Sequence, residues 1–114
     1  MILELFKAID AKDARVFASF LADDCRFRFG NLPELAGVGD IERFVAAFFD
    51  SIHSLSHDIG EIWEIPGGMV CHGRVTYVRH GGGSLTVPFC NVFKVSPGGI
   101  TDYLIFADTS GLYQ

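Results

Sequence analysis

Apolar residues in the first half of the chain recur at the spacing of amphipathic helices. One run covers residues 2–9, and a shorter run covers 16–21, where Asp13 precedes it as a candidate N-cap. The third run, over 41–52, follows an i, i+3, i+4, i+7, i+8, i+11 pattern with Asp40 as its candidate cap. The pattern therefore predicts three helices, and the third has the broadest apolar face.

From Leu55 onward the pattern changes to strands separated by glycine turns. A short alternating segment at 25–29 predicts one earlier strand, followed by a loop at 30–34. The later strands are expected near 56–65, 69–80, 84–95 and 100–108, with turns at 66–68, 81–83 and 97–99. Such short connections predict that consecutive strands are antiparallel neighbours.

The segment 85–108 has apolar residues on both faces of a predicted hairpin. An isolated two-stranded hairpin is not stable in water, so helices must cover one face, and more chain or a second molecule must cover the other. Helices first and an antiparallel meander last predict an α+β fold, with the helices packed on one face of the sheet. A length of 114 residues predicts one domain over 1–114.

The high content of hydrophobic residues predicts both an apolar pocket and an oligomer interface. Hydrophobic residues make up 49% of the chain and include eleven phenylalanines, yet no apolar run approaches the ~20 residues of a membrane span. The net charge is −5 and the nine basic residues are scattered, which predicts neither a nucleic acid nor a membrane as partner. Charge interrupts residues 1–7 too early for a signal peptide. We therefore expect a cytoplasmic protein. Its three cysteines, Cys25, Cys71 and Cys90, are widely spaced and odd in number, and they are expected to be reduced thiols.

Several local sequences resemble the SnoaL-like branch of the nuclear transport factor 2-like superfamily. They are Leu-Ala-Asp-Asp-Cys at 21–25, the glycine-led segment 37–44, Ser-His-Asp-Ile at 56–59, and the closing hairpin 91–108. The resemblance covers nearly the whole chain and implies a cone: a strongly curved antiparallel or mixed sheet wrapped around the N-terminal helices, as in cystatin-like α+β barrels. Members include ketosteroid isomerase, polyketide cyclases and limonene epoxide hydrolase, so the fold implies no single reaction.

The resemblance to limonene epoxide hydrolase implies which strand residues face the pocket. Phe27 and Phe29 take the positions of the family's water-holding tyrosine and asparagine. The inward residues on three later strands are expected to be His72, Arg74, Thr76 and Val78; Val87, Phe89, Asn91 and Phe93; and Tyr103, Ile105 and Ala107. Alternation within a strand follows from its two-residue period, but the choice of inward set rests on the resemblance, and one bulge would exchange the sets.

Known chemistries of the family are only partly represented. Arg74 matches the catalytic arginine of the epoxide hydrolase, but Thr76 and Ile105 replace its two aspartates. The first strand also lacks the base aspartate of ketosteroid isomerase. The sequence therefore predicts neither reaction.

A few polar residues expected in the pocket could support a different reaction, based on anion binding and proton transfer. Arg74 would bind a carboxylate or enolate oxygen, and His57 or His72 would carry a proton near neutral pH. The residues expected to position the ligand are Asn91, Thr76, Tyr103, Phe27, Phe29, Phe89 and Ile105.

Each polar residue also has a structural alternative, because buried charges must be paired. Arg74 could pair with Asp58 or Glu61, and His57 could be hydrogen-bonded within the core. The predicted function is binding of a small apolar ligand, either by an isomerase, cyclase or lyase acting through proton transfer, or by a non-catalytic ligand-binding or structural dimer. No cofactor and no metal are expected, since His53 and His57 lack a third ligand at suitable spacing.

The same strand orientation predicts an apolar patch on the convex face of the sheet. Its main members would be Val75, Tyr77, Val92, Leu104 and Phe106, beside Pro88 and Cys90. Such a patch is larger than monomers normally expose, so a homodimer through this face is expected.

Overall fold

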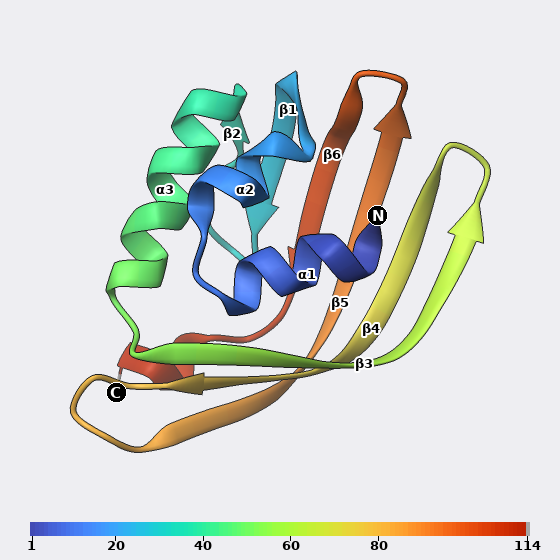
Figure 1. Cartoon of the computed structure of the whole chain (residues 1–114). Coiled ribbons are helices and arrows are strands. Elements are labelled where there is room, and N and C mark those ends of the chain that lie inside the picture. Colours follow the sequence, from blue (N-terminus) through green and yellow to red (C-terminus); the bar gives the residue numbers. More distant parts are fainter. Residues whose placement is uncertain (114) are drawn as a thin grey trace.

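The computed structural model describes residues 1–113, in which helices come first and a strand meander last (Figure 1). The helices are α1 (Ile2–Asp10), α2 (Ala14–Ser19) and α3 (Val38–Asp50), with a short 3-10 helix, η1 (Ser110–Tyr113). The strands are β1 (Leu21–Phe29), β2 (Leu35–Ala36), β3 (Ser54–Ile65), β4 (Gly68–Val78), β5 (Ser84–Ser96) and β6 (Gly99–Phe106). The fold is α+β, as predicted. Within residues 1–113, no helix combines the length and apolarity needed to cross a membrane.

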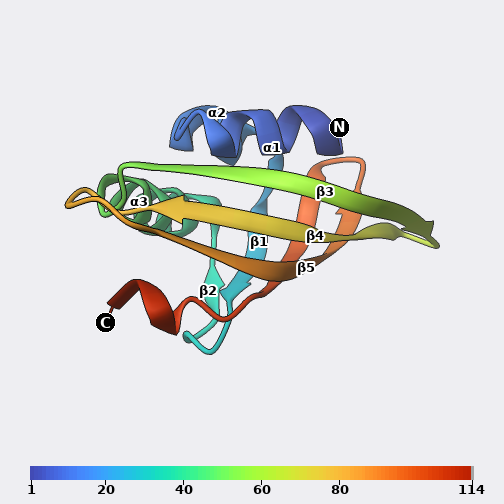
Figure 2. The same cartoon turned by 90° about the horizontal axis from the view of Figure 1, so that it is seen from below.

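The six described strands form one mixed sheet in the order β2-β1-β6-β5-β4-β3. Strands β3 to β6 form the predicted antiparallel meander, and β1 joins β6 in parallel. Figures 1 and 2 show the long strands curving around the side that carries the helices. This curvature produces the concave face on which a pocket was expected.

Aromatic side chains dominate the core between the helices and the concave face. Tyr103 on β6 is 1% exposed and contacts Phe93 of β5 edge to face, with ring centroids 4.5 Å apart. Phe17 of α2 and Phe27 of β1 lie against the same tyrosine, at 5.7 and 5.4 Å. Each such aromatic pair adds about 0.5–1.5 kcal/mol beyond the burial of its area. The Tyr103 side chain of β6 therefore packs against residues of α2, β1 and β5 at the same time.

Two boundaries near the helices differ from expectation. Asp13 caps α2 as predicted, because its side chain accepts a hydrogen bond from the Val16 backbone nitrogen at 3.0 Å. Helix α3, however, begins at Val38 behind Gly37, whose φ of 95° lies in the region that glycine tolerates. Asp40 is therefore inside the helix, where it forms an ion pair with Arg43. Strand β1 begins earlier than residue 25, and β2 lies beyond the predicted loop.

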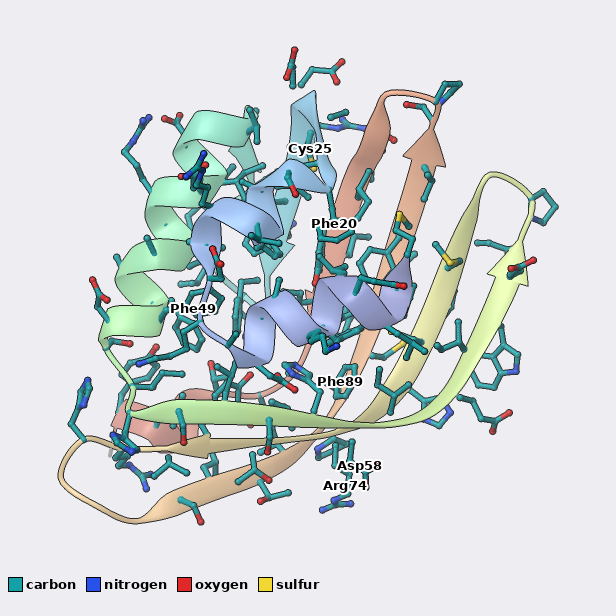
Figure 3. The ribbon with its side chains drawn as sticks, viewed as in Figure 1. Phe20, Cys25, Phe49, Asp58, Arg74 and Phe89 are labelled. Atoms are coloured by element: carbon teal, nitrogen blue, oxygen red, sulfur yellow. The ribbon has the colours of Figure 1, made fainter. Side chains whose placement is uncertain are left out.

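The side chains of β4 point to the opposite faces of the sheet from those predicted. Phe89 and Asn91 of β5 do face the helices as expected, and their partners on β4 are Gly73 and Cys71. Residues directly opposite each other share a face of the sheet, so the odd-numbered residues of β4 face inward. Arg74 is consequently exposed, and Figure 3 shows it with Asp58 on the side away from the helices. The predicted inward positions of His72, Arg74, Thr76 and Val78 are wrong.

A bulge at Gly60 bends the β3–β4 hairpin. Ile59 pairs with Gly73 and Glu61 pairs with His72, so one residue of β3 has no partner between them. A Cβ at Gly73 would overlap the carbonyl oxygen of Asp58, which means that this close approach requires glycine. Before the bulge, His57 faces inward; after it, the strand continues beyond the helices with the opposite alternation.

Candidate functional site

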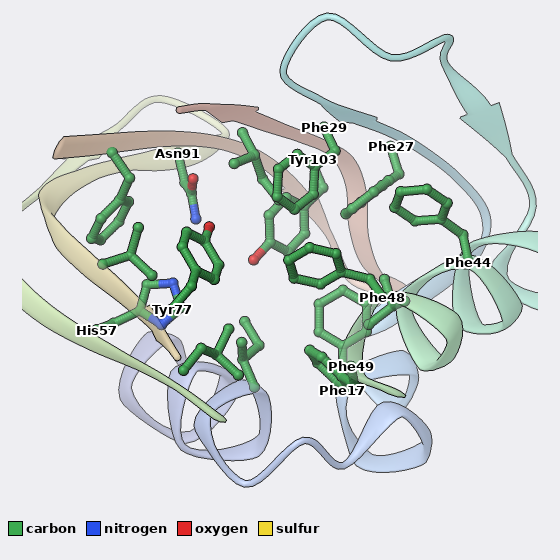
Figure 4. Close-up of a pocket in the computed structure, with 16 residues that line it drawn as sticks. Phe17, Phe27, Phe29, Phe44, Phe48, Phe49, His57, Tyr77, Asn91 and Tyr103 are labelled. Carbon is green, nitrogen blue, oxygen red and sulfur yellow. The ribbon is translucent and has the colours of Figure 1, made fainter. Parts of the chain in front are cut away.

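A cavity of about 40 Å³ lies between the concave face of the sheet and the helices. Its sixteen lining residues are mostly apolar and include seven phenylalanines. Four lining side chains carry polar groups: His57, Tyr77, Asn91 and Tyr103. Figure 4 shows their polar ends turned toward the same space, opposite the phenylalanines of α3. The site is thus a small apolar chamber with polar groups on one wall.

His57 enters this wall from β3 and is held by Asp10, the last residue of α1. Its ring nitrogen Nδ1 lies 2.6 Å from Asp10 Oδ1, and its backbone nitrogen donates to Oδ2 at 3.0 Å. Because a carboxylate only accepts hydrogen bonds, the bond assigns the hydrogen of the neutral ring to Nδ1. The opposite nitrogen, Nε2, makes no hydrogen bond within residues 1–113 and remains an acceptor. The His57 side chain is only 9% exposed.

Asn91 of β5 is the one polar or charged residue classed as buried within residues 1–113, at 2% exposure. Its side-chain oxygen Oδ1 has no hydrogen-bond partner. An unsatisfied buried acceptor costs about 1–3 kcal/mol, so a fold does not retain one without a reason. Since Asn91 lines the cavity, a donor on a bound molecule or water would satisfy it.

Tyr77 and Tyr103 add hydroxyl groups that stay protonated. Burial raises the pKa of Tyr77 well above its ordinary value, with a smaller contribution from Tyr113. Burial also raises the pKa of Tyr103, which is 1% exposed. Neither hydroxyl makes a hydrogen bond to residues 1–113, so both can donate to an oxygen atom in the cavity.

The structure brings together most of the predicted site residues. The cavity is lined by His57, Asn91, Tyr103, Phe27, Phe29, Phe89 and Ile105. Three predicted members lie instead on the outer face of β4. Thr76 contacts the Thr86 hydroxyl at 2.8 Å, His72 stacks on Trp63 with centroids 4.9 Å apart, and Arg74 forms no ion pair within residues 1–113. The predicted carboxylate-binding arginine is therefore absent from the chamber.

Sequence reasoning missed Asp10 and Tyr77. Asp10 is 47 residues from His57, and no local spacing connects a helix end with a distant strand. Tyr77 was assigned to the convex face by the wrong choice of alternation, which the pairing of β4 with β5 corrects. The cavity phenylalanines of α3 belong to the apolar face that the helical pattern already predicted.

The chemistry available in the chamber is proton transfer with hydrogen bonding. His57 offers an acceptor nitrogen, the two tyrosines offer donors, and Asn91 offers both. Within residues 1–113, no group of three or more His, Cys, Asp or Glu side chains is arranged to hold a metal ion.

Comparison with protein-family models shows the family of the chain. The model of the SnoaL-like domain matches residues 2–103. The chain belongs to the SnoaL-like domain family. No curated protein sequence is significantly similar to this SnoaL-like domain.

Solved structures with the same fold are similar over nearly the full length. A candidate SnoaL-like polyketide cyclase from Jannaschia sp. CCS1 has a TM-score of 0.85 and 18% identity, covering 98% of this chain and 85% of that chain. A protein from Catenulispora acidiphila with a ketosteroid isomerase-like fold, in complex with trimethylamine, has a TM-score of 0.87 and 13% identity, with coverages of 96% and 85%. An epoxide hydrolase from M. tuberculosis of the limonene epoxide hydrolase type has a TM-score of 0.82 and 14% identity, with coverages of 98% and 83%. At these identities the likeness shows the cone-shaped fold alone.

Proposed function

We propose that this SnoaL-like domain binds a small, largely apolar carbonyl compound in the chamber and moves a proton on it. The observation that carries the proposal is the Asp10–His57 pair, with Nδ1 held at 2.6 Å and Nε2 free on the cavity wall. A carboxylate on one ring nitrogen orients the imidazole and stabilises the imidazolium that forms when the other nitrogen takes a proton. The apolar lining excludes water from the transfer.

The proposed step uses groups already on the wall. Nε2 of His57 takes a proton from the carbon next to the carbonyl, and the C–H electrons form a carbon–carbon double bond while the carbonyl electrons move to oxygen. Tyr77 and Tyr103 donate hydrogen bonds to that oxygen, where negative charge develops. The imidazolium then returns its proton to carbon or to a leaving group, which completes an isomerase- or lyase-type reaction.

A second candidate function is ligand binding without catalysis. The His57 ring packs against Phe6 and Phe89, with centroid distances of 4.7 and 5.1 Å, and Asp10 also accepts from the His57 backbone. These contacts suit a residue that joins α1 to β3 for structural reasons. The similarity to a protein in complex with trimethylamine supports small-molecule binding by the fold and is neutral on catalysis.

Hydrogen–deuterium exchange on 2-tetralone, a small apolar ketone with acidic α-protons, separates the two functions. Wild-type protein should accelerate the exchange followed by NMR in D₂O, and His57→Gln should reduce the acceleration by about 10²–10⁴-fold, the usual contribution of acid–base catalysis. His53→Gln, at an exposed position, is the matched control and should leave the rate unchanged. Binding of the ketone without any accelerated exchange would favour the non-catalytic function.

We also propose that the outer sheet face forms a homodimer with a second copy of this chain. Val75 and Tyr77 do not belong to the patch, because they face the cavity. An apolar row nevertheless crosses the outer face in register, with Val70 opposite Val92 and Val92 opposite Leu104. Trp63 and Phe106, which are 46% and 57% exposed, flank the row. Isologous packing of this face would cover both copies at once.

A further inference from the structure

The chamber is too small for the ligand that its polar groups would recognise. Its volume of about 40 Å³ holds a water molecule or two, whereas an apolar cavity needs roughly 150 Å³ to bind benzene. Yet four polar side chains face it, and the Asn91 oxygen among them has no partner. A ligand can reach these groups only if part of the wall moves.

A much larger open groove lies on the other side of one wall. Its volume is about 1150 Å³, and it is lined by Ala47 of α3, Ser51 directly after that helix and Tyr113 of η1, among others. Four residues line both the groove and the inner chamber: Phe29, Phe44, Phe48 and Ile105. This shared wall separates the polar groups from the groove.

Among these four residues, Phe48 is the best placed to move. Phe29 and Ile105 are partners in the β1–β6 pairing, so the sheet fixes their backbones side by side. Phe44 lies one turn before Phe48 in α3, against Phe27 and Phe29. The Phe48 ring contacts Tyr77, which lines only the chamber, edge to face at 5.9 Å, and Phe29 of the shared wall at 5.2 Å (Figure 4).

The surroundings of Phe48 allow its side chain to turn while the helix stays in place. The neighbouring groove residues Ala47 and Ser51 are small, which leaves room beside the ring. The end of α3 is fixed by Lys12, whose Nζ donates to the carbonyl oxygens of Phe49 and Ile52 at 3.2 and 2.9 Å. Rotation about χ1 of Phe48 therefore changes the wall without displacing the backbone.

We propose that Phe48 is a gate between the groove and the chamber, and that its ring sets both the rate of ligand entry and the largest ligand that fits. With the ring turned outward, chamber and groove form one continuous site. The polar end of the ligand then faces Asn91 and His57, and its apolar body occupies the space that the ring leaves. The proposal rests on the proposed function only in requiring that the chamber receives a ligand.

A series of phenols of increasing size tests the gate, because each carries one hydroxyl for the polar wall. Phenol, 2-naphthol and 9-phenanthrol have one, two and three rings, and stopped-flow fluorescence measures their association rates. Phe48→Ala should raise the association rate of 2-naphthol at least about tenfold and admit 9-phenanthrol. Phe48→Leu should give an intermediate rate and Phe48→Trp a lower rate than wild type, so a poorly folded alanine variant would not end the test.

Leu3→Ala is the matched control, because Leu3 is 66% exposed on α1 and lines neither the groove nor the chamber. Its association rates should equal those of the wild type. Equal rates for wild type, Phe48→Leu and Phe48→Trp would overturn the gate while leaving the chamber as a binding site. Failure of every variant to bind any phenol would overturn the gate and the ligand chamber together. The predicted rate order without accelerated exchange of 2-tetralone would support the gate and contradict the proposed proton transfer.

Discussion

Replacing Asn91 by leucine should make the protein more stable. The side chain is 2% exposed, and its oxygen has no hydrogen-bond partner. Leucine removes the unsatisfied acceptor, worth about 1–3 kcal/mol, and its slightly greater bulk can extend into the adjacent cavity of about 40 Å³. We therefore expect the free energy of unfolding to rise by about 1–3 kcal/mol. For a domain of this size, that corresponds to an increase in Tm of roughly 4–12 °C.

Urea denaturation and calorimetry of wild type and Asn91→Leu measure this gain. Asn31→Leu is the matched control: its side chain is exposed, so the expected change is within about ±0.5 kcal/mol. The same Asn91→Leu variant should bind 2-naphthol more weakly, because the ligand hydroxyl loses its acceptor. A gain in stability together with a loss of binding is the pattern expected where a functional group is retained at the expense of the fold.

A loss of 1 kcal/mol or more in Asn91→Leu would refute this reasoning. It would mean that the amide is hydrogen-bonded in the folded protein and that the residue stabilises the junction of β4, β5 and β6. If Asn91→Leu is more stable but binds 2-naphthol as tightly as the wild type, the stability argument holds. The proposed hydrogen bond between Asn91 and the ligand would then be wrong.

Three further predictions concern other parts of the molecule. Asp10→Asn should lower the 2-tetralone exchange rate by about 10–10³-fold, because His57 loses the carboxylate that stabilises its imidazolium; an unchanged rate would contradict the proposed role of the pair. Burial raises the pKa of Cys25 to about 12 and that of Cys71 to about 11, from an ordinary value of 9.0, so the fold favours the neutral thiols. Their contribution to stability is complete below about pH 9 and is lost as the pH rises through 11 to 12; urea midpoints measured from pH 8 to 11 should fall, and less steeply in Cys71→Ala. Phe106→Lys should convert the expected dimer to a monomer in light scattering, and a wild type that is already monomeric at tens of micromolar would contradict the interface.

Much of the fold could be predicted because its signals are local. The 3.6-residue period at 41–52 marks a helix in any context, and Pro-Gly-Gly or Gly-Gly-Gly segments permit only tight connections between strands. The N-cap at Asp13 was likewise predictable from the residues that follow it. The cap of α3 was not, because Asp40 and Gly37 both suit a helix start and only the path of the chain from β2 decides between them.

The sequence by itself determined three helices, an antiparallel meander and the alternation within the stretches of strand that carry no bulge. It also identified His57, Asn91 and Tyr103, which the structure places on one cavity wall. The inward face of β4 was decided by its pairing with β5, because the predicted choice rested on the resemblance to limonene epoxide hydrolase. The pairing turns the more apolar set, Met69, Cys71, Val75 and Tyr77, toward the helices. The Asp10–His57 contact likewise depends on where α1 lies across β3, since a hydrogen bond over 47 residues leaves no periodic trace in the chain.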